Sequence, residues 1–287
     1  MRQASAFSLL GSARVTAVRE GRSLSRAVRR SLQRPTPHTD VHVAGPGVGR
    51  AEDHYGGVLV GAATIGALSE QPEIHAEARR LLAALTPDDY SEYVSDFMDL
   101  GRHTAGQGWR YSDIVTVLLA ASKLLQPASY LEIGVRRGRS MATVASVRPE
   151  CALLAIDLWQ PGYAGMENPG PDFVRGELGA VGHRGPLELI SGDSHKVLPQ
   201  LFRSRPDLTF DLVTVDGDHS PDGAAQDLRD VLPRLRIGGA VVFDDVRHRC
   251  HPELGAVWGR VVGADPRYST YEFADNGFGV AVGVRSW

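Results

Sequence analysis

The stretch Ser129-Tyr-Leu-Glu-Ile-Gly-Val-Arg-Arg-Gly-Arg-Ser140 decides how the chain folds. Apolar residues run up to Ile133, and Gly134 and Gly138 follow in a segment that is compatible with the start of a helix. This order predicts a strand, a tight turn and a helix, a layout that brings backbone N–H groups close to a nucleotide-like ligand. The turn alone does not identify that ligand, because many unrelated loops hold two glycines.

Strands and helices alternate after this stretch, as hydrophobic periodicity and turn residues indicate. Short apolar runs, each expected to be buried on both faces, predict five strands at 129–134, 152–157, 187–191, 210–216 and 239–244. Helices are predicted at 139–147, 194–204, 221–235 and 253–264. Two final β-rich runs have no helix between them and are expected to pair as an antiparallel hairpin, at 268–273 and 278–285. We therefore predict an α/β fold with a Rossmann-like, doubly wound, mostly parallel seven-stranded sheet that ends in this hairpin.

The chain before residue 129 divides into two parts. Residues 1–50 are basic and contain prolines and glycines, with eight arginines and one acid among the first 34 residues. A mitochondrial transit peptide has this composition too, but we favour a basic N-terminal arm and linker. Residues 51–128 show helical periodicity and predict three helices, which lie near 72–85, from 86 to 101 and at 111–126. We expect this region to be a helical cap or oligomerisation element before the main domain at 129–287, and we expect a homo-oligomer.

Composition excludes several classes of partner. The 287 residues carry a formal net charge of −3, which gives no basic field for nucleic acid or for an anionic membrane. No apolar run approaches the ~20 residues that a membrane span needs. Two cysteines, Cys151 and Cys250, are too few for a disulfide framework and fit a reducing compartment, so we expect a cytoplasmic protein.

An acid stands at or near the end of every predicted parallel strand, at Glu132, Asp157, Asp193, Asp216 and the pair Asp244-Asp245. In an open parallel sheet, ligands bind beyond the carboxyl ends of the strands. Helix capping and loop solubility explain one or two such acids, but they do not easily explain one at each of five strands. These carboxylates repel one another unless a cation or hydrogen-bond donors compensate.

The spacing of the first acids is typical of a nucleoside site. Asp157 lies 23 residues after Gly134, close to the distance at which a carboxylate meets a ribose diol. Asp193 and Ser194 follow the third strand and are placed to meet an adenine edge. For Asp193 a second interpretation stays open, because an acid at this position also caps the helix predicted at 194.

Two cofactor classes use this scaffold. A dinucleotide dehydrogenase needs the pattern G-x-G-x-x-G, whereas this loop has two glycines and an acid two residues before the first of them. The loop resembles the first motif of the class I S-adenosylmethionine-dependent methyltransferases, acid-x-Gly-x-x-x-Gly. Residues that match this motif are Glu132, Gly134 and Gly138. The resemblance implies contacts with S-adenosylmethionine at these three residues and at Ser140, Asp157, Asp193, Ser194 and Asp216.

Two later segments narrow the resemblance. They read Phe210-Asp-Leu-Val-Thr-Val-Asp-Gly-Asp-His-Ser220 and Leu232-Pro-Arg-Leu-Arg-Ile-Gly-Gly-Ala-Val-Val-Phe-Asp-Asp-Val246. These segments are similar to the metal-dependent sugar O-methyltransferases of the macrocin and mycinamicin type, and to cephalosporin-hydroxylase-like relatives. The resemblance covers roughly residues 105 to 285 and implies an acceptor that is a sugar or a glycosylated natural product. Alternatives are an NAD-dependent oxidoreductase and a non-catalytic cofactor-binding partner protein.

The residue chemistry agrees with this resemblance. Neighbouring strands lie about 5 Å apart, so Asp216, Asp244 and Asp245 are expected to converge and to hold Mg²⁺ or a similar divalent cation. His219 lies three residues after Asp216 and is placed to remove a proton from the acceptor hydroxyl. An exposed loop histidine is the competing interpretation of His219, and with the resemblance we favour the general base. Arg247 or His248 is expected to meet an anionic part of the acceptor.

Overall fold

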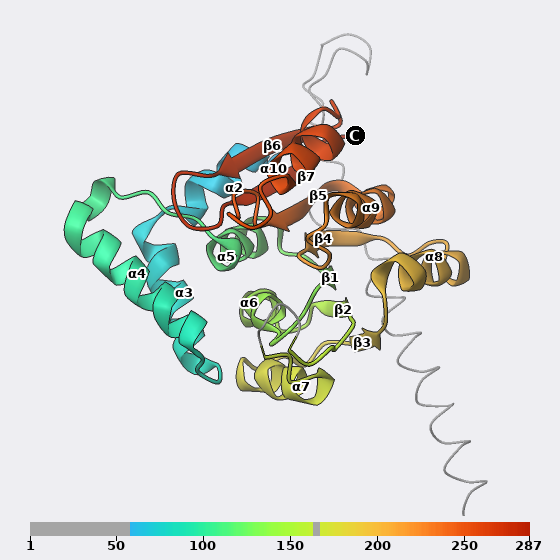
Figure 1. Ribbon diagram of the computed structural model, residues 1–287, viewed down its shortest axis with the longest axis horizontal. Coiled ribbons are helices and arrows are strands. Elements are labelled where there is room, and N and C mark those ends of the chain that lie inside the picture. The colour runs from blue at the N-terminus through green and yellow to red at the C-terminus, as the bar shows by residue number, and fades with distance from the viewer. Residues whose placement is uncertain (1–57, 163–166) are drawn as a thin grey trace, which may run out of the picture.

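A computed structural model describes residues 58–162 and 167–287 of the chain (Figure 1). The predicted arm and linker at 1–50 lie outside these residues. The helices and strands in chain order are α2 (Ala62–Ser69), α3 (Pro72–Ala84), α4 (Asp89–Ala105), α5 (Ile114–Leu125), β1 (Ser129–Ile133), α6 (Arg139–Val147), β2 (Ala152–Asp157), α7 (Pro171–Ala180), β3 (Leu187–Ser191), α8 (Ser194–Ser204), β4 (Phe210–Val215), α9 (Pro221–Val231), β5 (Leu235–Asp244), α10 (Leu254–Trp258), β6 (Tyr268–Phe273) and β7 (Val280–Arg285).

The strands form one seven-stranded sheet in the order β3-β2-β1-β4-β5-β7-β6. The first five strands pair in parallel, and β7 pairs antiparallel with both β5 and β6. The predicted Rossmann-like sheet with a C-terminal hairpin is therefore confirmed. The strand order reverses between β1 and β4, which is the position where open parallel sheets bind ligands beyond their strand ends.

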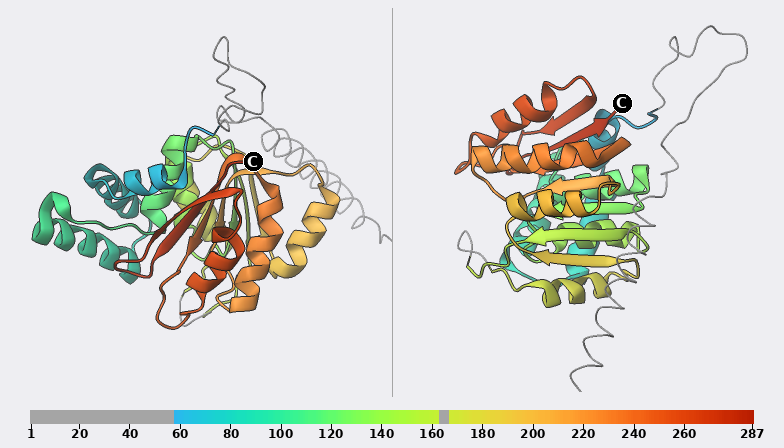
Figure 2. Two further views of the ribbon diagram at one scale, coloured as in Figure 1. Left: turned by 90° about the horizontal axis from the view of Figure 1, so that it is seen from above. Right: turned by 90° about the vertical axis from the view of Figure 1, so that its right-hand side faces the viewer.

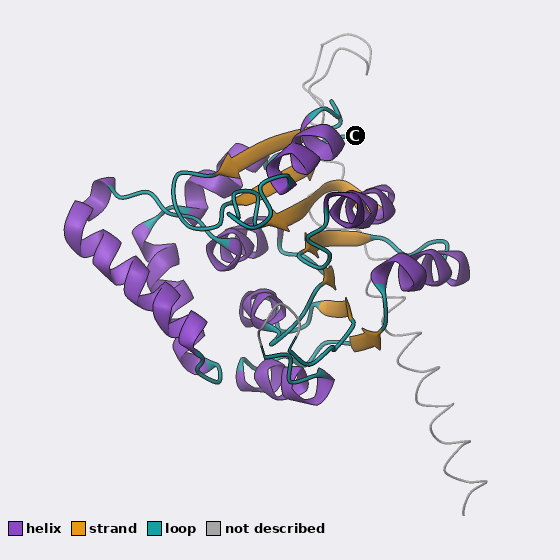
Figure 3. Ribbon diagram, in the orientation of Figure 1, coloured by secondary structure: helices purple, strands orange, loops and turns teal. Residues whose placement is uncertain are grey.

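Helices cover both faces of the sheet, as Figure 2 shows, and Figure 3 shows the strands stacked between them. Alternate residues of β1 serve the two faces: Tyr130 packs with α2, α5 and α6, whereas Leu131 packs with α8, α9 and α10. Helix α4 lies further out, on the far side of α3 from the sheet (Figure 1). Within the described residues, no helix combines the length and the apolar character that crossing a bilayer demands.

Proline explains one difference from the predicted elements. The helix that was expected to run to residue 235 ends at Val231, and a 3-10 turn follows at Leu232–Arg234. Pro233 cannot donate the backbone hydrogen bond that an α-helix needs, so the α-helix does not continue past it. Leu235 thereby becomes the first residue of β5, four residues earlier than predicted, rather than the last residue of the helix.

Helix boundaries before the sheet also differ from the prediction. Helix α4 continues through Gly101 to Ala105. This glycine is a packing position and not the end of the helix, since a Cβ there would lie 2.1 Å from the Trp109 ring. The next helix begins at Ile114 rather than at 111, since the Asp113 carboxylate accepts a hydrogen bond from the Thr116 amide and closes a capping box.

One expectation about the sheet needs correction. Strand β3 is half-buried rather than buried on both faces, because it is an edge strand of the sheet. The insertion 158–186 between β2 and β3 holds α7, whose Val174 and Leu178 are buried. Val174 packs against Gly138, so this insertion touches the loop after β1 directly.

Candidate active site at the carboxyl ends of β4 and β5

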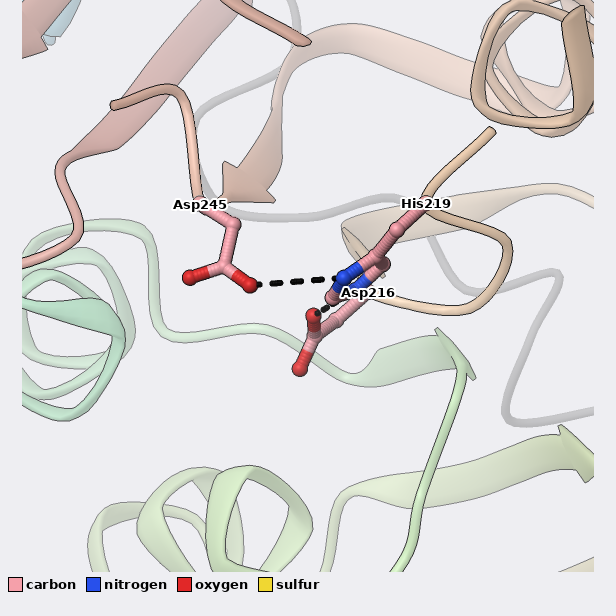
Figure 4. A group of neighbouring side chains, drawn as sticks. All are labelled: Asp216, His219 and Asp245. Atoms are coloured by element: carbon pink, nitrogen blue, oxygen red, sulfur yellow. Dashed lines mark hydrogen bonds and ion pairs between the residues drawn. The ribbon is translucent and has the colours of Figure 1, made fainter. Parts of the chain in front are cut away.

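Three side chains converge where β4 and β5 end (Figure 4). Asp216 follows β4 directly, His219 lies in the loop before α9, and Asp245 follows β5 directly. His219 Nε2 lies 3.2 Å from Asp216 Oδ1, and His219 Nδ1 lies 3.5 Å from Asp245 Oδ2. One ligand atom from each residue lies within 4.8 Å of the other two, as in a site that could hold a metal ion.

The local backbone explains this convergence. The Asp216 amide donates to the Ile133 carbonyl at 2.9 Å, which ties the end of β4 to the end of β1. Ser220 caps α9 through a hydrogen bond from the Gly223 amide, so only a short loop separates the strand from the helix and holds His219. Asp245 adopts a left-handed backbone conformation, with φ of 62°, as the chain turns out of β5.

The electrostatics of this cluster favour a bound cation. Burial and the charge of Asp216 raise the pKa of the Asp245 carboxyl to about 7. The pKa of His219 is raised as well, first by its hydrogen bond with Asp216 and also by the charges of Asp216 and Asp245, although burial opposes this change. Two carboxylates and an imidazole therefore face one another with unbalanced negative charge. Carboxylate oxygens and imidazole nitrogen are ordinary ligands of divalent metals, so the donor set fits such an ion.

Asp244 takes a different position from the predicted one. In the part of the chain that the structure describes, it does not belong to the group formed by Asp216, His219 and Asp245. Burial, followed by the charges of Asp245 and Asp216, holds the pKa of the Asp244 carboxyl well above its usual range. The structure thus brings Asp216 and Asp245 together with His219, whereas Asp244 is their neighbour, and the metal ligands stay a prediction.

Asp244 lies on the wall of a cavity of about 780 Å³. Aromatic residues from α4, from the segment before α5 and from the β6–β7 turn line much of it, namely Tyr90, Tyr93, Phe97, Tyr111 and Phe278. Its polar lining includes Asp113, Arg247 and Arg249. The Tyr111 hydroxyl donates to Asp113 Oδ2 at 3.1 Å, so one part of the wall carries an ordered polar pair.

The glycine loop after β1 reaches the same edge of the sheet. Gly134 and Gly138 adopt φ angles of 82° and 77°, which side chains rarely tolerate. A Cβ at Gly134 would lie 2.0 Å from the Asp216 carbonyl oxygen, so glycine allows β1 and β4 to approach at their ends. Asp157 Oδ2 accepts hydrogen bonds from the backbone amides of residues 135 and 136, at 2.7 and 2.9 Å, and thereby holds the loop.

A family comparison connects the glycine loop with the cluster after β5. Residues 131–246 match the model of a methyltransferase-domain family, and this match spans the loop, Asp216, His219 and Asp245. This part of the chain is a methyltransferase domain, consistent with the class I S-adenosylmethionine-dependent methyltransferases. The family match favours methyl transfer over the hydride transfer of a dehydrogenase.

Solved methyltransferases have similar folds at low identity. CalS11, a TDP-rhamnose 3′-O-methyltransferase of calicheamicin biosynthesis, is 21% identical and has a TM-score of 0.47, with 74% of this chain and 93% of that chain covered. An O-methyltransferase from Bacillus cereus is 17% identical with a TM-score of 0.49, covering 73% and 97%. TomG from Streptomyces achromogenes, an O-methyltransferase of tomaymycin synthesis, is 20% identical with a TM-score of 0.47, covering 75% and 91%. A comparison with curated proteins finds no match.

Two residues of the methyltransferase motif lie at different depths. Glu132 is buried, with 1% of its surface exposed, and accepts a hydrogen bond of 2.5 Å from the Tyr130 hydroxyl. Burial raises the pKa of Glu132 well above its usual range. Its carboxyl therefore lies inside the sheet–helix interface of the methyltransferase, whereas Ser140 is half-buried in the first turn of α6.

The end of β3 shows the capping role that the sequence left open. The Asp193 carboxylate accepts a hydrogen bond from the His195 amide at 3.0 Å and pairs with Lys196 at 2.9 Å, so it caps α8. The Ser194 hydroxyl donates to the buried carboxylate of Asp227 at 2.7 Å. Contacts of Asp193 and Ser194 with adenine stay a prediction.

Several residues around the candidate site carry no signal in the sequence. Asp227 and Tyr90 fall within the helices predicted at 221–235 and from 86 to 101, and nothing local distinguishes them. Asn168, whose amide donates to Asp157 Oδ1 at 3.1 Å, gave no signal at all. Each of these residues meets its partner through the tertiary fold, so no local spacing could have revealed it.

Proposed function

We propose that this methyltransferase transfers the methyl group of S-adenosylmethionine to a hydroxyl oxygen of a small molecule, a sugar or a glycosylated natural product. His219 acts as the general base, and a divalent cation such as Mg²⁺ assists. The observation that carries this proposal is the His219 imidazole, held between Asp216 and Asp245 next to an aromatic-lined cavity.

The cofactor is proposed to lie across the ends of β1, β2 and β3. Gly134 and Gly138 leave backbone surface open to its methionine end, and Asp157 is placed for the ribose. Asp157 Oδ1 already accepts hydrogen bonds from the Trp159 amide at 2.6 Å and from Asn168 at 3.1 Å. The ribose hydroxyls are therefore expected to replace the Asn168 amide, while Oδ2 keeps its hold on the loop.

Methyl transfer to a hydroxyl needs a proton acceptor and a cation that balances the negative charges of Asp216 and Asp245. His219 Nε2 or Nδ1 takes the proton of the acceptor hydroxyl, while the oxygen forms its bond to the methyl carbon and the sulfur–methyl bond breaks. Asp216 and Asp245 would hold the cation, with Asp244 beside them. The bound ion supplies Lewis-acid help, because it lowers the pKa of a hydroxyl that it contacts. Holding the two reactants in line supplies much of the remaining rate gain.

The cavity beside Asp244 is the proposed acceptor site. Its volume of about 780 Å³ falls within the range that receives drug-sized ligands, which suits a glycosylated compound. Ring faces of Tyr90 and Tyr111 can stack on a sugar or another ring, and Asp113 can accept from hydroxyls. Arg247 and Arg249 lie on the same wall and can meet an anionic substituent.

We also propose a cytoplasmic homo-oligomer. Cys151 and Cys250 are both free thiols, which fits a reducing compartment. Tyr93 and Leu100 of α4 are 62% and 64% exposed, and a second copy of this chain would cover such apolar surface.

Ligand binding and metal removal test the proposed function. Isothermal calorimetry should show binding of S-adenosylmethionine, and this ligand should raise the melting temperature whereas NADH should not. With candidate glycosides, methyl transfer should be lost after treatment with EDTA and should return with Mg²⁺. Absence of S-adenosylmethionine binding would overturn the proposal, and full activity after exhaustive chelation would remove the cation from it.

A further inference from the structure

Asp88 lies between two arginines of the cofactor loop. Arg139 Nη2 donates to both carboxylate oxygens of Asp88 at 3.0 Å, and Arg137 Nε lies 3.3 Å from Asp88 Oδ2. All three side chains are largely buried, with exposed fractions of 15% for Asp88, 8% for Arg137 and 15% for Arg139. Contacts of this depth are screened by solvent far less than ion pairs on the surface.

The same arginines reach two further segments. Arg137 forms an ion pair with Glu167 and its guanidinium lies 4.6 Å from the centre of the Phe173 ring, both from the insertion after β2. It also donates to the Thr86 carbonyl at 3.3 Å. Thr86 in turn donates through its hydroxyl to the buried Glu177 of α7 at 2.6 Å. Three segments that are far apart in the sequence thus meet at one charged cluster.

Asp88 connects this cluster to the wall of the cavity. Its carboxylate accepts a hydrogen bond from the Ser91 amide at 2.8 Å, so it is the N-cap of α4. The Arg139 guanidinium lies 4.9 Å from the centre of the Tyr90 ring, and Tyr90 lines the cavity. One carboxylate therefore both begins the helix that forms the aromatic wall and binds the two arginines that flank Gly138.

The charges favour an ionised Asp88. Burial would raise the pKa of its carboxyl, but the hydrogen bonds from Ser91 and the charge of Arg139 lower it overall. Without this carboxylate, Arg139 would lose its ion-pair partner, and Arg137 would keep only Glu167, which is 66% exposed. The loop would then be held against α4 more weakly, by the contacts of Arg139 with the Ser91 hydroxyl and the Tyr90 ring and of Arg137 with the Thr86 carbonyl.

We propose that Asp88 is a positioning residue that couples the cofactor loop to the acceptor wall on α4. Binding of the cofactor to the loop stabilises Arg137 and Arg139 in their positions, and these residues stabilise the first turns of α4 through Asp88. Coupling of this kind is reciprocal, so an ordered wall also strengthens cofactor binding. The inference rests on the proposed cofactor site, but it does not need the acceptor to be known.

Amide hydrogen exchange of the full chain tests this coupling, with S-adenosylhomocysteine as the probe. In the wild-type protein, the probe should slow exchange in peptides that cover 89–105. In Asp88→Asn this slowing should disappear, and the affinity measured by calorimetry should fall about 10-fold, within the usual range of coupling between sites. Asp89→Asn is the matched control, because Asp89 is exposed in the same helical turn and should behave as wild type.

Three outcomes decide between the possibilities. Binding of the probe without slower exchange in α4 would overturn the coupling and leave the cofactor site intact. Unchanged slowing in Asp88→Asn would also overturn it. No binding to the wild-type protein would overturn the cofactor site and the coupling together. If Asp88→Asn does not fold, Arg139→Gln breaks the same link from the side of the loop and should give the same loss.

Discussion

The acids after β2 and β3 differ sharply from those after β4 and β5. Asp157 and Asp193 accept hydrogen bonds from backbone amides and therefore build the loops around them. Asp216 and Asp245 face each other across His219, and burial together with the charge of Asp216 raises the pKa of Asp245. Aspartates at one edge of the sheet thus have two different roles. The difference depends on how many hydrogen-bond donors of the protein each carboxylate already binds. The pair Asp216 and Asp245, which binds few, is the one that can take part in chemistry.

The largest expected effect comes from removing His219, the proposed base between Asp216 and Asp245. His219→Ala should lower kcat by about 10²- to 10⁴-fold, the usual contribution of a positioned proton acceptor. Binding of S-adenosylmethionine should change little, because the proposed cofactor loop is the glycine loop after β1. Steady-state kinetics and calorimetry measure the two quantities. His103→Ala, an exposed histidine of α4, is the control, and equal kcat values for the two variants would remove His219 from its role.

The next effect concerns the contact between the ends of β1 and β4, where the two groups of aspartates meet. Gly134→Ala should destabilise the protein by about 3 kcal/mol or more, because the new methyl group would meet the backbone of Asp216 at 2.0 Å in a left-handed conformation. Urea unfolding measures the change. Gly176→Ala is the control: no atom lies within 4 Å of its Cβ position in α7, so it should stabilise the helix by about 0.5–1 kcal/mol. A tolerated Gly134→Ala would contradict the close approach of β1 and β4.

Asp227 is intermediate between the two groups of aspartates in the number of hydrogen-bond donors that it binds. Its Oδ1 accepts from Ser194, and among the described residues nothing donates to its Oδ2. Burial raises the pKa of this carboxyl to about 6. The folded protein therefore keeps a proton between pH 4 and 6 that the unfolded chain releases, and this contribution to stability is lost as the pH rises through 6. The free energy of unfolding should fall by about 2–3 kcal/mol over this interval, at about 1.4 kcal/mol for each pKa unit.

Asp227→Asn should remove this part of the pH dependence. Urea unfolding at pH 4.5 and pH 6.5 compares the variant with the wild type, and other titrating groups cancel in the difference. Identical slopes for the two proteins would show that Asp227 does not hold its proton in the folded state.

The sequence allowed much of the fold and half of the site to be predicted. Apolar runs gave the strands, because residues buried on both faces leave a pattern that does not depend on partners. Asp216, His219 and Asp245 were singled out from their places at and after strand ends, and the structure brings them together, whereas their roles stay predictions. The separate role of Asp244 was not, since the left-handed turn at Asp245 is a backbone feature without a local signal. The contact of Asp88 with Arg137 crosses 49 residues (137 − 88), and only the fold brings these two together.

The smallest expected effects are changes in the free energy of unfolding. They have opposite signs for one aspartate of each group, Asp157 and Asp245. Asp157→Asn should destabilise the metal-free protein by about 1–3 kcal/mol, since an amide group cannot accept on both sides from the four donors that Asp157 now binds. Asp245→Asn should stabilise it by about 1 kcal/mol or more at pH 8, where a carboxyl with a pKa of about 7 is ionised at a cost. Asparagine also tolerates the left-handed backbone at this position.

Urea unfolding at pH 8 in EDTA compares these two variants directly. Added Mg²⁺ should stabilise the wild-type protein and have less effect on Asp245→Asn, because the proposed ion would lose a charged ligand. A loss of stability in both variants would mean that Asp245, like Asp157, is held by the fold for structural reasons. The negative charge after β5 would then be no evidence for a bound cation, because the Asp245 carboxylate would already stabilise the metal-free protein.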